Sequence, residues 1–209
     1  MLKFDDWGMI DYQQALEKQL EKVNEVSESQ SEDFGFLIFC THPAVVTLGR
    51  KTQSGDVFGW KGPIIEISRG GRATYHGPSQ LVVYPILKIK DIGKYLRNLE
   101  DAIIATLRDY AVDAVGKTPQ KKSDTEDANE ETGVWVGKQK IASLGIGVKK
   151  WITYHGAAIN LDEDPQAFTG MKPCGFNSET MVSLEKLTGR KIDRQEFSDK
   201  LKQRLLDVL

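Results

Sequence analysis

Short strand-like segments, more than helices, dominate the pattern of this sequence. Each is an apolar run rich in branched or aromatic residues, and glycine-rich or charged turns separate the runs. Helices and strands do not alternate regularly along the chain, which is typical of an α+β protein and not of a doubly wound parallel sheet. We therefore predict an α+β fold in which helices flank a mixed β-sheet. The runs are FGFLIFC, PIIEIS, LVVYPI, GVWVG, KIASLGIGV and WITYHGAAIN.

Three segments carry the apolar periodicity of a helix with one buried face. The first runs from Asp11 to about Val26, and the second runs from about Lys94 to Tyr110. The third begins after Asp193, with Glu196 placed to complete a capping box, and continues to the C-terminus. We expect these helices to flank the sheet.

The size of the chain favours a single domain. Its 209 residues are 40% hydrophobic and 28% charged, which is enough to bury one sizeable core. The polar segment KTPQKKSDTEDANEET, from Lys117 to Thr132, is rich in acids toward its end. Only about eighty residues follow it, and they include the most motif-like segments. We interpret this segment as a mobile loop and predict one catalytic domain over residues 1–209.

Composition excludes several classes of function. A net charge of -2 and a pI near 6.0 leave no broad basic field for nucleic acid, and no polybasic run adjoins an apolar segment that could hold a membrane. Two cysteines cannot form a disulfide framework and show no zinc-site spacing, which indicates a reducing compartment. The acidic N-terminus lacks the order of a secretion signal or transit peptide, so we expect a cytoplasmic protein without a metal site.

A glycine-rich segment, RGGRATYHGPSQ from Arg69 to Gln80, follows a predicted strand. Adjacent glycines allow positive φ and let backbone N–H groups approach a carboxyl, thioester carbonyl or phosphate group closely. The same composition also suits a tight hairpin with exposed arginines. The presence of Tyr75 and His76 favours a binding site.

All three histidines precede a proline or a glycine. A histidine beside a turn can offer its ring to a ligand without the backbone closing over it. We assign His42 to a structural role and keep His76 and His155 as site candidates.

Cys174 lies between a proline and a glycine in GMKPCGFNS, where the backbone turns and water can reach the thiol. This position suits a nucleophile, whereas Cys40 closes an apolar run and is interpreted as a core thiol. Lys140 opens the run KIASLGIGV and so projects from a rigid element, although a lysine at a strand start is usually solvated. The adjoining GVWVGKQ is not a phosphate loop, because its glycine spacing and the residue after its lysine are wrong.

Five motifs occur in order from about His42 to Phe176, namely HPAVVTLGR, RGGRATYHGPSQ, GKQKIASLGIGV, ITYHGAAIN and MKPCGF. Together they resemble the lipoyl(octanoyl) transferase family, the acyltransferases that start lipoate assembly. The resemblance implies the class II synthetase-like α+β fold that this family shares with biotin protein ligases and lipoate-protein ligases. That fold agrees with the one predicted from the strand pattern.

The resemblance also implies roles for particular residues. Cys174 would carry an acyl thioester, and Lys140 would stabilise its thiolate and handle protons. Backbone N–H groups around Gly175 or in the RGG and SLG segments would hold the oxyanion. The acyl site would be lined by Arg69, Gly70, Gly71, Arg72, Ala73, Thr74, Tyr75, His76, Ser143, Leu144, Gly145, His155, Gly156 and Ala157.

The implied reaction moves an octanoyl group from octanoyl-acyl carrier protein, through Cys174, to a lysine of a lipoyl domain. It needs neither ATP nor a cofactor. The implied acceptors are the lipoyl domains of 2-oxoacid dehydrogenase complexes and the glycine cleavage H protein, and we expect the enzyme to be a monomer.

The sequence departs from the family pattern in three places. Ser79 stands where glycine is usual in GPGQ, and this leaves the geometry of that loop open. Ala157 stands where a larger apolar residue usually follows HG, and it would leave extra room beside the acyl chain. The acidic loop before Gly133 is longer than is typical.

Three other functions stay open at this point. An acyl-adenylate ligase of the same fold class would hold a nucleotide phosphate with RGGRA, but it needs no nucleophilic thiol. A cysteine hydrolase would use His155 as its base, but local signatures around the cysteine are missing. A non-catalytic acyl-binding module would leave the combination of Cys174 and Lys140 unexplained.

Overall fold

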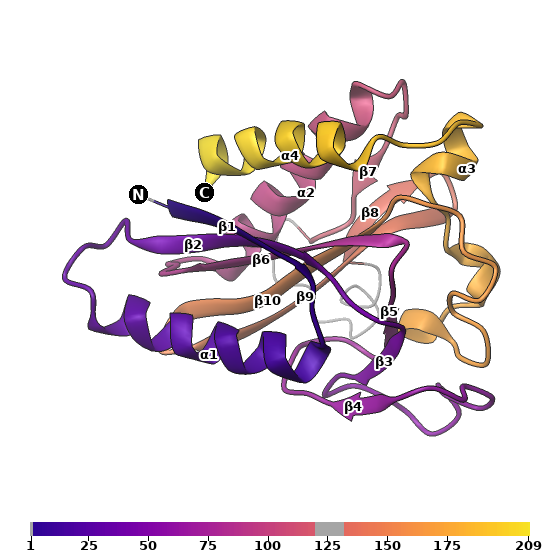
Figure 1. Ribbon diagram of the computed structural model, residues 1–209, viewed down its shortest axis with the longest axis horizontal. Helices are drawn as coiled ribbons and strands as arrows, with labels where there is room; N and C mark the ends of the chain where they lie inside the picture. Colours follow the sequence, from indigo (N-terminus) through magenta and orange to yellow (C-terminus); the bar gives the residue numbers. More distant parts are fainter. Residues whose placement is uncertain (1, 120–131) are drawn as a thin grey trace.

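The computed structural model describes residues 2–119 and 132–209, and its centre is a seven-stranded mixed sheet (Figure 1). The strand order is β1-β2-β6-β10-β9-β8-β7. β1 pairs with β2 in parallel, and the other neighbours pair antiparallel. The strands are β1 Leu2–Met9, β2 Gly35–Thr41, β6 Gln80–Leu87, β7 Val115–Gly116, β8 Gly133–Val136, β9 Gln139–Lys149 and β10 Ile152–Asn160.

A smaller sheet has the strand order β4-β3-β5. Its strands are β3 Val45–Leu48, β4 Ile64–Glu66 and β5 Thr74–His76. The Gly70 N–H donates to the Ile146 carbonyl of β9 at 3.0 Å, which ties the segment before β5 to the main sheet. The glycine-rich segment thus connects the two sheets.

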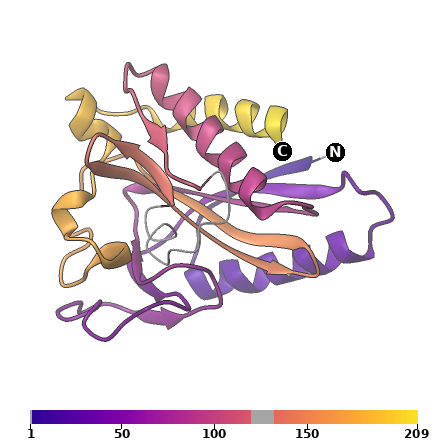
Figure 2. The same cartoon turned by 180° about the vertical axis from the view of Figure 1, so that it is seen from behind.

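Helices cover both faces of the main sheet (Figures 1 and 2). Ala15, Val23 and Val26 of α1 join one buried core with side chains of β2, β6 and β10. α2 and α4 pack together on the opposite face, where Leu99 and Phe197 are part of a second core. The helices are α1 Tyr12–Glu28, α2 Ile92–Arg108, α3 Leu184–Thr188 and α4 Arg194–Val208, and short 3₁₀ turns form η2 Pro173–Gly175 and η3 Ser178–Thr180.

Each of the three long helices starts at an aspartate, namely Asp11, Asp91 or Asp193, whose side chain accepts a backbone N–H of the first turn. Half of the capping box predicted for α4 is confirmed, because Asp193 accepts from the Glu196 N–H at 3.0 Å. The Glu196 carboxylate itself accepts from Lys200 Nζ at 2.6 Å. The start of this helix was therefore predictable from its cap.

The predicted mixed α+β sheet with flanking helices is confirmed, and each predicted run contains an observed strand. Four strands and α3 were not predicted. β1 is an edge strand with mostly exposed residues, so no apolar alternation marks it. β3, β5 and β7 have only 4, 3 and 2 residues, which is too few to show a period.

The loop predicted from Lys117 to Thr132 falls mainly on residues 120–131, which lie outside the described residues. Its two flanks meet at the buried Glu100 of α2. The Glu100 carboxylate accepts from the N–H groups of Thr118 and Gly133, each at 3.0 Å. One side chain thus joins the residues on both sides of the segment.

Among the helices of residues 2–119 and 132–209, none is both long and apolar enough to span a membrane. The same residues hold no group of three or more His, Cys, Asp or Glu side chains that could bind a metal ion.

Candidate active site

A cavity lies between the central strands β6, β9 and β10, the segment that leads into β5, and η2. It contains about 570 Å³ of space that atoms do not fill, part of it open to solvent. Most of the site residues predicted from the sequence line this cavity. They are Arg69, Gly71, Arg72, Thr74, His76, Lys140, Ser143, Leu144, Gly145, His155, Gly156, Ala157 and Cys174.

Three predicted site residues lie behind the cavity wall and do not line it. The Gly70 N–H donates to β9, as described above. Ala73 is fully buried, and its carbonyl accepts from the Cys174 N–H at 2.8 Å. Tyr75 packs against Phe168, and its hydroxyl donates to Asp164 at 3.1 Å. Each of the three supports a neighbouring segment, and their predicted role in the acyl site stays a prediction.

Sequence reasoning missed five cavity residues. Tyr12 had been placed only on the buried face of a helix, and Val82, Tyr84 and Ala158 only in strands, so nothing separated them from core residues. Val82 and Tyr84 alternate along β6 and therefore share one face, which is the signal that could have paired them. The missed residues are Tyr12, Val82, Tyr84, Thr132 and Ala158.

Cys174 sits at the tip of the tight turn η2. Its φ of 53° is in the left-handed region, which non-glycine residues rarely adopt. The turn is held by the bond to Ala73 and by the Gly175 N–H, which donates to the Lys172 carbonyl at 3.0 Å. The Cys174 side chain is half-buried, so the turn presents the thiol at the cavity without covering it.

Arg72 supports this turn from the side. Its guanidinium forms an ion pair with the buried Asp56, including a 3.1 Å bond from Nε. Burial acts to raise the pKa of the Asp56 carboxyl, but the bonds from Arg72 and from the Gln53 N–H outweigh burial and lower it. The same guanidinium occupies the space that a side chain on Gly175 would need. Arg72 is therefore fixed against the nucleophile turn.

Lys140 is the second residue of β9 and is only 1% exposed. Its Nζ lies 5.4 Å from the ring centroid of Trp135 and 5.9 Å from that of Phe176. A Cβ on Gly133 would lie 2.6 Å from Lys140 Cε, so the absent side chain makes room for the lysine. A lysine at a strand start is usually solvated, but the amine of Lys140 is packed in the cavity wall.

Two histidines and two tyrosines also line the cavity. Burial lowers the pKa of the His76 and His155 rings, that of His155 to about 3, so both rings are neutral at physiological pH. The Tyr12 ring stacks on His76. His42 Nδ1 donates to the Ile10 carbonyl and its Nε2 bonds to the Tyr84 hydroxyl, which agrees with its predicted structural role.

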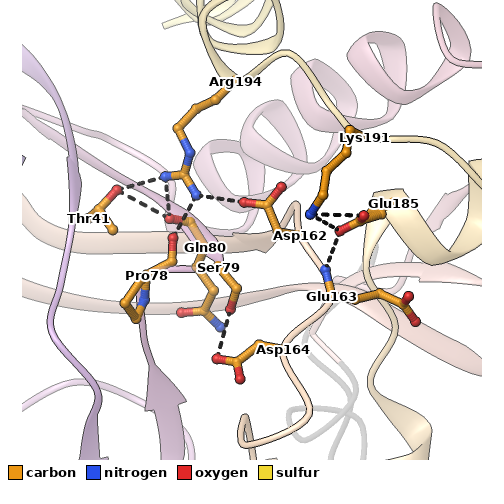
Figure 3. A network of polar contacts seen from close by, with 10 residues as sticks. All are labelled: Thr41, Pro78, Ser79, Gln80, Asp162, Glu163, Asp164, Glu185, Lys191 and Arg194. Atoms are coloured by element: carbon orange, nitrogen blue, oxygen red, sulfur yellow. Dashed lines mark hydrogen bonds and ion pairs between the residues drawn. The ribbon is translucent and has the colours of Figure 1, made fainter.

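A polar network fixes the loop that follows His76 (Figure 3). Arg194 donates to the Pro78 carbonyl at 2.7 Å and forms an ion pair with Asp162 at 3.2 Å. Ser79, where the family pattern has glycine, donates its hydroxyl to Asp164 at 3.4 Å. The departure at Ser79 thus adds a contact between this loop and the residues after β10.

Comparisons with known proteins show the family of this chain. The family model described as the lipoyl protein ligase A/B catalytic domain matches residues 11–206. An octanoyltransferase from Bdellovibrio bacteriovorus is 55% identical over 219 residues, which cover 100% of this chain and 99% of the relative.

Two solved structures share the fold. A lipoate-protein ligase A bound with ATP has a TM-score of 0.72 at 18% identity, and the match covers 99% of this chain and 84% of that chain. An archaeal bipartite lipoate protein ligase, studied with its E2 lipoyl domain from Thermoplasma acidophilum, has a TM-score of 0.58 at 16% identity and coverages of 99% and 82%. The fold is therefore that of lipoate-protein ligases, as the resemblance implied.

The chain belongs to the lipoyl protein ligase A/B catalytic domain family. Its full-length match is to an octanoyltransferase, so within that family it is an acyltransferase, as predicted.

Proposed function

We propose that this protein transfers an octanoyl group from octanoyl-acyl carrier protein, through a thioester on Cys174, to a lysine of a lipoyl domain. The observation that carries the proposal is that Cys174 and Lys140, which are far apart in the sequence, line one cavity. A partly exposed thiol supplies the nucleophile, and a packed amine in the wall of the same cavity supplies the acid and base.

In the first half-reaction, the Cys174 thiolate attacks the thioester carbonyl of the donor. The new C–S bond forms, the bond to the donor sulfur breaks, and the ammonium of Lys140 gives its proton to the departing thiolate. One thioester replaces another, so no ATP is needed. The acyl-enzyme is left with a neutral Lys140.

In the second half-reaction, the neutral ε-amine of the acceptor lysine attacks the acyl-Cys174 carbonyl. A C–N bond forms, the C–S bond breaks, and Cys174 leaves as a thiolate. The amine proton passes to Lys140, which regenerates the starting ammonium and thiolate. The charges balance over the cycle without a further reactant.

Both half-reactions form a tetrahedral oxyanion that needs positive partners. Two of the N–H groups predicted to supply them, those of Gly70 and Gly175, donate to the carbonyls of Ile146 and Lys172 at 3.0 Å. The predicted donors that remain are Gly71 and the SLG segment.

The competing functions are less well supported. A hydrolase with His155 as its base is disfavoured, because a ring with a pKa of about 3 is a weak base. The likeness to an ATP-bound ligase concerns the fold alone, whereas the full-length match is to an octanoyltransferase. We further propose that residues 1–209 act as one catalytic domain, as a monomer in the cytoplasm. The proposed acceptors are the lipoyl domains of 2-oxoacid dehydrogenase complexes and the glycine cleavage H protein.

Intact mass spectrometry tests the proposal. Wild-type protein incubated with octanoyl-acyl carrier protein, without ATP, should gain one octanoyl group on Cys174 and lose it to an added lipoyl domain. A lipoyl domain with its acceptor lysine replaced should leave the acyl-enzyme intact. Acylation that requires free octanoate and ATP would identify a ligase instead, and octanoate released without acceptor would identify a hydrolase.

Gly175→Ala should slow transfer about 10- to 100-fold without unfolding the protein. The added Cβ would collide with the Arg72 guanidinium, and the φ of 84° is unfavourable for alanine, so the nucleophile turn must shift. Gly137→Ala is the matched control, because its φ of 57° carries a similar backbone cost and no atom lies within 4 Å. Transfer kinetics and thermal unfolding of both variants measure the effect. Equal transfer rates in the two variants would show that the turn does not position the thiol.

A further inference from the structure

Arg69 is a buried cation without an acidic partner in the part of the chain that the structure describes. It is 5% exposed, and its guanidinium donates only to neutral oxygens, namely the Gly70 carbonyl and the carbonyl and hydroxyl of Thr47, at 2.9 to 3.1 Å. Its Nε has no partner, although that atom is buried. A buried charge is costly unless an opposite charge compensates it, so the position calls for an anion.

The surrounding backbone is shaped around this side chain. A Cβ on Gly49 would lie 2.8 Å from Arg69 Nη1, and a Cβ on Gly145 would lie 3.2 Å from its Cδ. Arg69 lines the same cavity as Cys174, whose N–H is bonded to Ala73 four residues further along the segment. The guanidinium is thus held at the cavity and cannot swing out to solvent.

The other titratable groups of this cavity are Tyr12, Arg72, His76, Tyr84, Lys140, His155 and Cys174. Burial keeps both tyrosines and both histidines neutral at physiological pH, and Arg72 is paired with Asp56. Burial also lowers the pKa of the Arg69 guanidinium, while the negative charges that Tyr12 and Cys174 can carry raise it. Arginine nevertheless stays protonated in proteins.

Proton balance shows when such a cation is needed. In the acyl-enzyme, Lys140 is neutral because it must accept a proton from the acceptor amine. It then offers no positive charge to the oxyanion that forms as the amine attacks. A cation that never gives up its proton can stabilise this oxyanion.

We propose that Arg69 supplies the permanent positive charge that stabilises the oxyanion formed while Lys140 is neutral. This inference rests on the proposed function. It gives the two cations different tasks, since Lys140 moves protons and Arg69 holds negative charge.

The two half-reactions, measured separately, test the proposal. Acyl-enzyme formed with octanoyl-acyl carrier protein is isolated, and its transfer to a lipoyl domain is followed by intact mass. Arg69→Gln should slow this second step about 100-fold, and more than it slows acylation. Arg69→Lys should recover part of the loss, because it restores a charge. Arg50→Gln removes an exposed arginine whose N–H donates to the Arg69 carbonyl, and it should change neither step.

Equal slowing in Arg69→Gln and Arg69→Lys, or an unchanged second step in Arg69→Gln, would overturn the proposal. Thermal unfolding of both variants shows whether instability alone explains a loss of transfer, and that result would also count against the proposal. If the wild-type protein forms no acyl-enzyme, the proposed function fails. Alkylation of Cys174 then tests the effect of the Arg69 charge independently.

The alkylation test keeps Arg69 in place. In Lys140→Met, Arg69 should still make Cys174 react faster with anionic iodoacetate, relative to neutral iodoacetamide, than a model thiol does. Most of this preference should remain in 1 M salt, because salt screens a buried charge poorly. A ratio equal to that of the model thiol would overturn the proposal, even if Arg69→Gln does not fold.

Discussion

Replacing Cys174 with alanine or serine is expected to abolish transfer to the lipoyl domain, by on the order of 10⁴-fold or more. Alanine removes the sulfur that forms the acyl bond. Serine keeps a hydroxyl at the same place, but its proton is far harder to remove than that of a thiol, and the oxygen ester would not form at a useful rate. Transfer is measured with octanoyl-acyl carrier protein and a lipoyl domain, and acylation is measured by intact mass.

Cys40→Ala is the matched control for this experiment. Cys40 lies in β2, is 1% exposed and belongs to the core beneath α1. Burial raises the pKa of its thiol, so it is not a nucleophile at neutral pH. The control should lower thermal stability slightly and leave transfer nearly intact. Equal loss in the two variants, or substantial transfer without Cys174, would reject the assignment of the nucleophile.

Replacing Lys140 is expected to have the second largest effect. Lys140→Met keeps most of the packed volume and removes the amine, so neither half-reaction has its acid or base, and transfer should fall about 10²- to 10⁴-fold. Lys140→Arg keeps a positive charge but has no removable proton, and transfer should fail in it as well. Its larger head must also fit beside Gly133, Trp135 and Phe176.

The two Lys140 variants should differ in how Cys174 reacts with iodoacetamide as a function of pH. Loss of the ammonium should move the curve of Lys140→Met to higher pH, whereas Lys140→Arg should move it less. Lys138→Ala, an exposed lysine in the turn before β9, controls for the loss of a surface charge. A curve for Lys140→Met that superimposes on wild type, together with normal transfer, would contradict both assigned roles.

The elements that the sequence predicted are those whose apolar pattern is long enough to read. β6 and β10 are buried along their whole length, β9 is buried over residues 140–142, and α2 and α4 carry clear apolar faces. β1 was not predicted because pairing with β2, and not burial of its own side chains, stabilises this strand. Local pattern therefore located the core but not the edge of the sheet.

The candidate site was predicted from motif order, and its geometry was not. No local pattern shows that Lys140 is packed under Gly133, or that Arg69 is buried without an acid, because both depend on strands that the fold brings together. Tyr12 was missed for the same reason. It lies on α1, yet its hydroxyl is 3.4 Å from His155 Nδ1 on β10.

The bonds from Glu100 to Thr118 and Gly133 have a consequence for how this chain can vary in length. Because Glu100 accepts from the N–H groups of both Thr118 and Gly133, the two ends of the intervening segment are fixed by α2 and not by the residues between them. Gly133, which makes room for Lys140, lies on the anchored side. A change in the length of the segment between Thr118 and Gly133 therefore leaves the backbone that makes room for Lys140 anchored to Glu100.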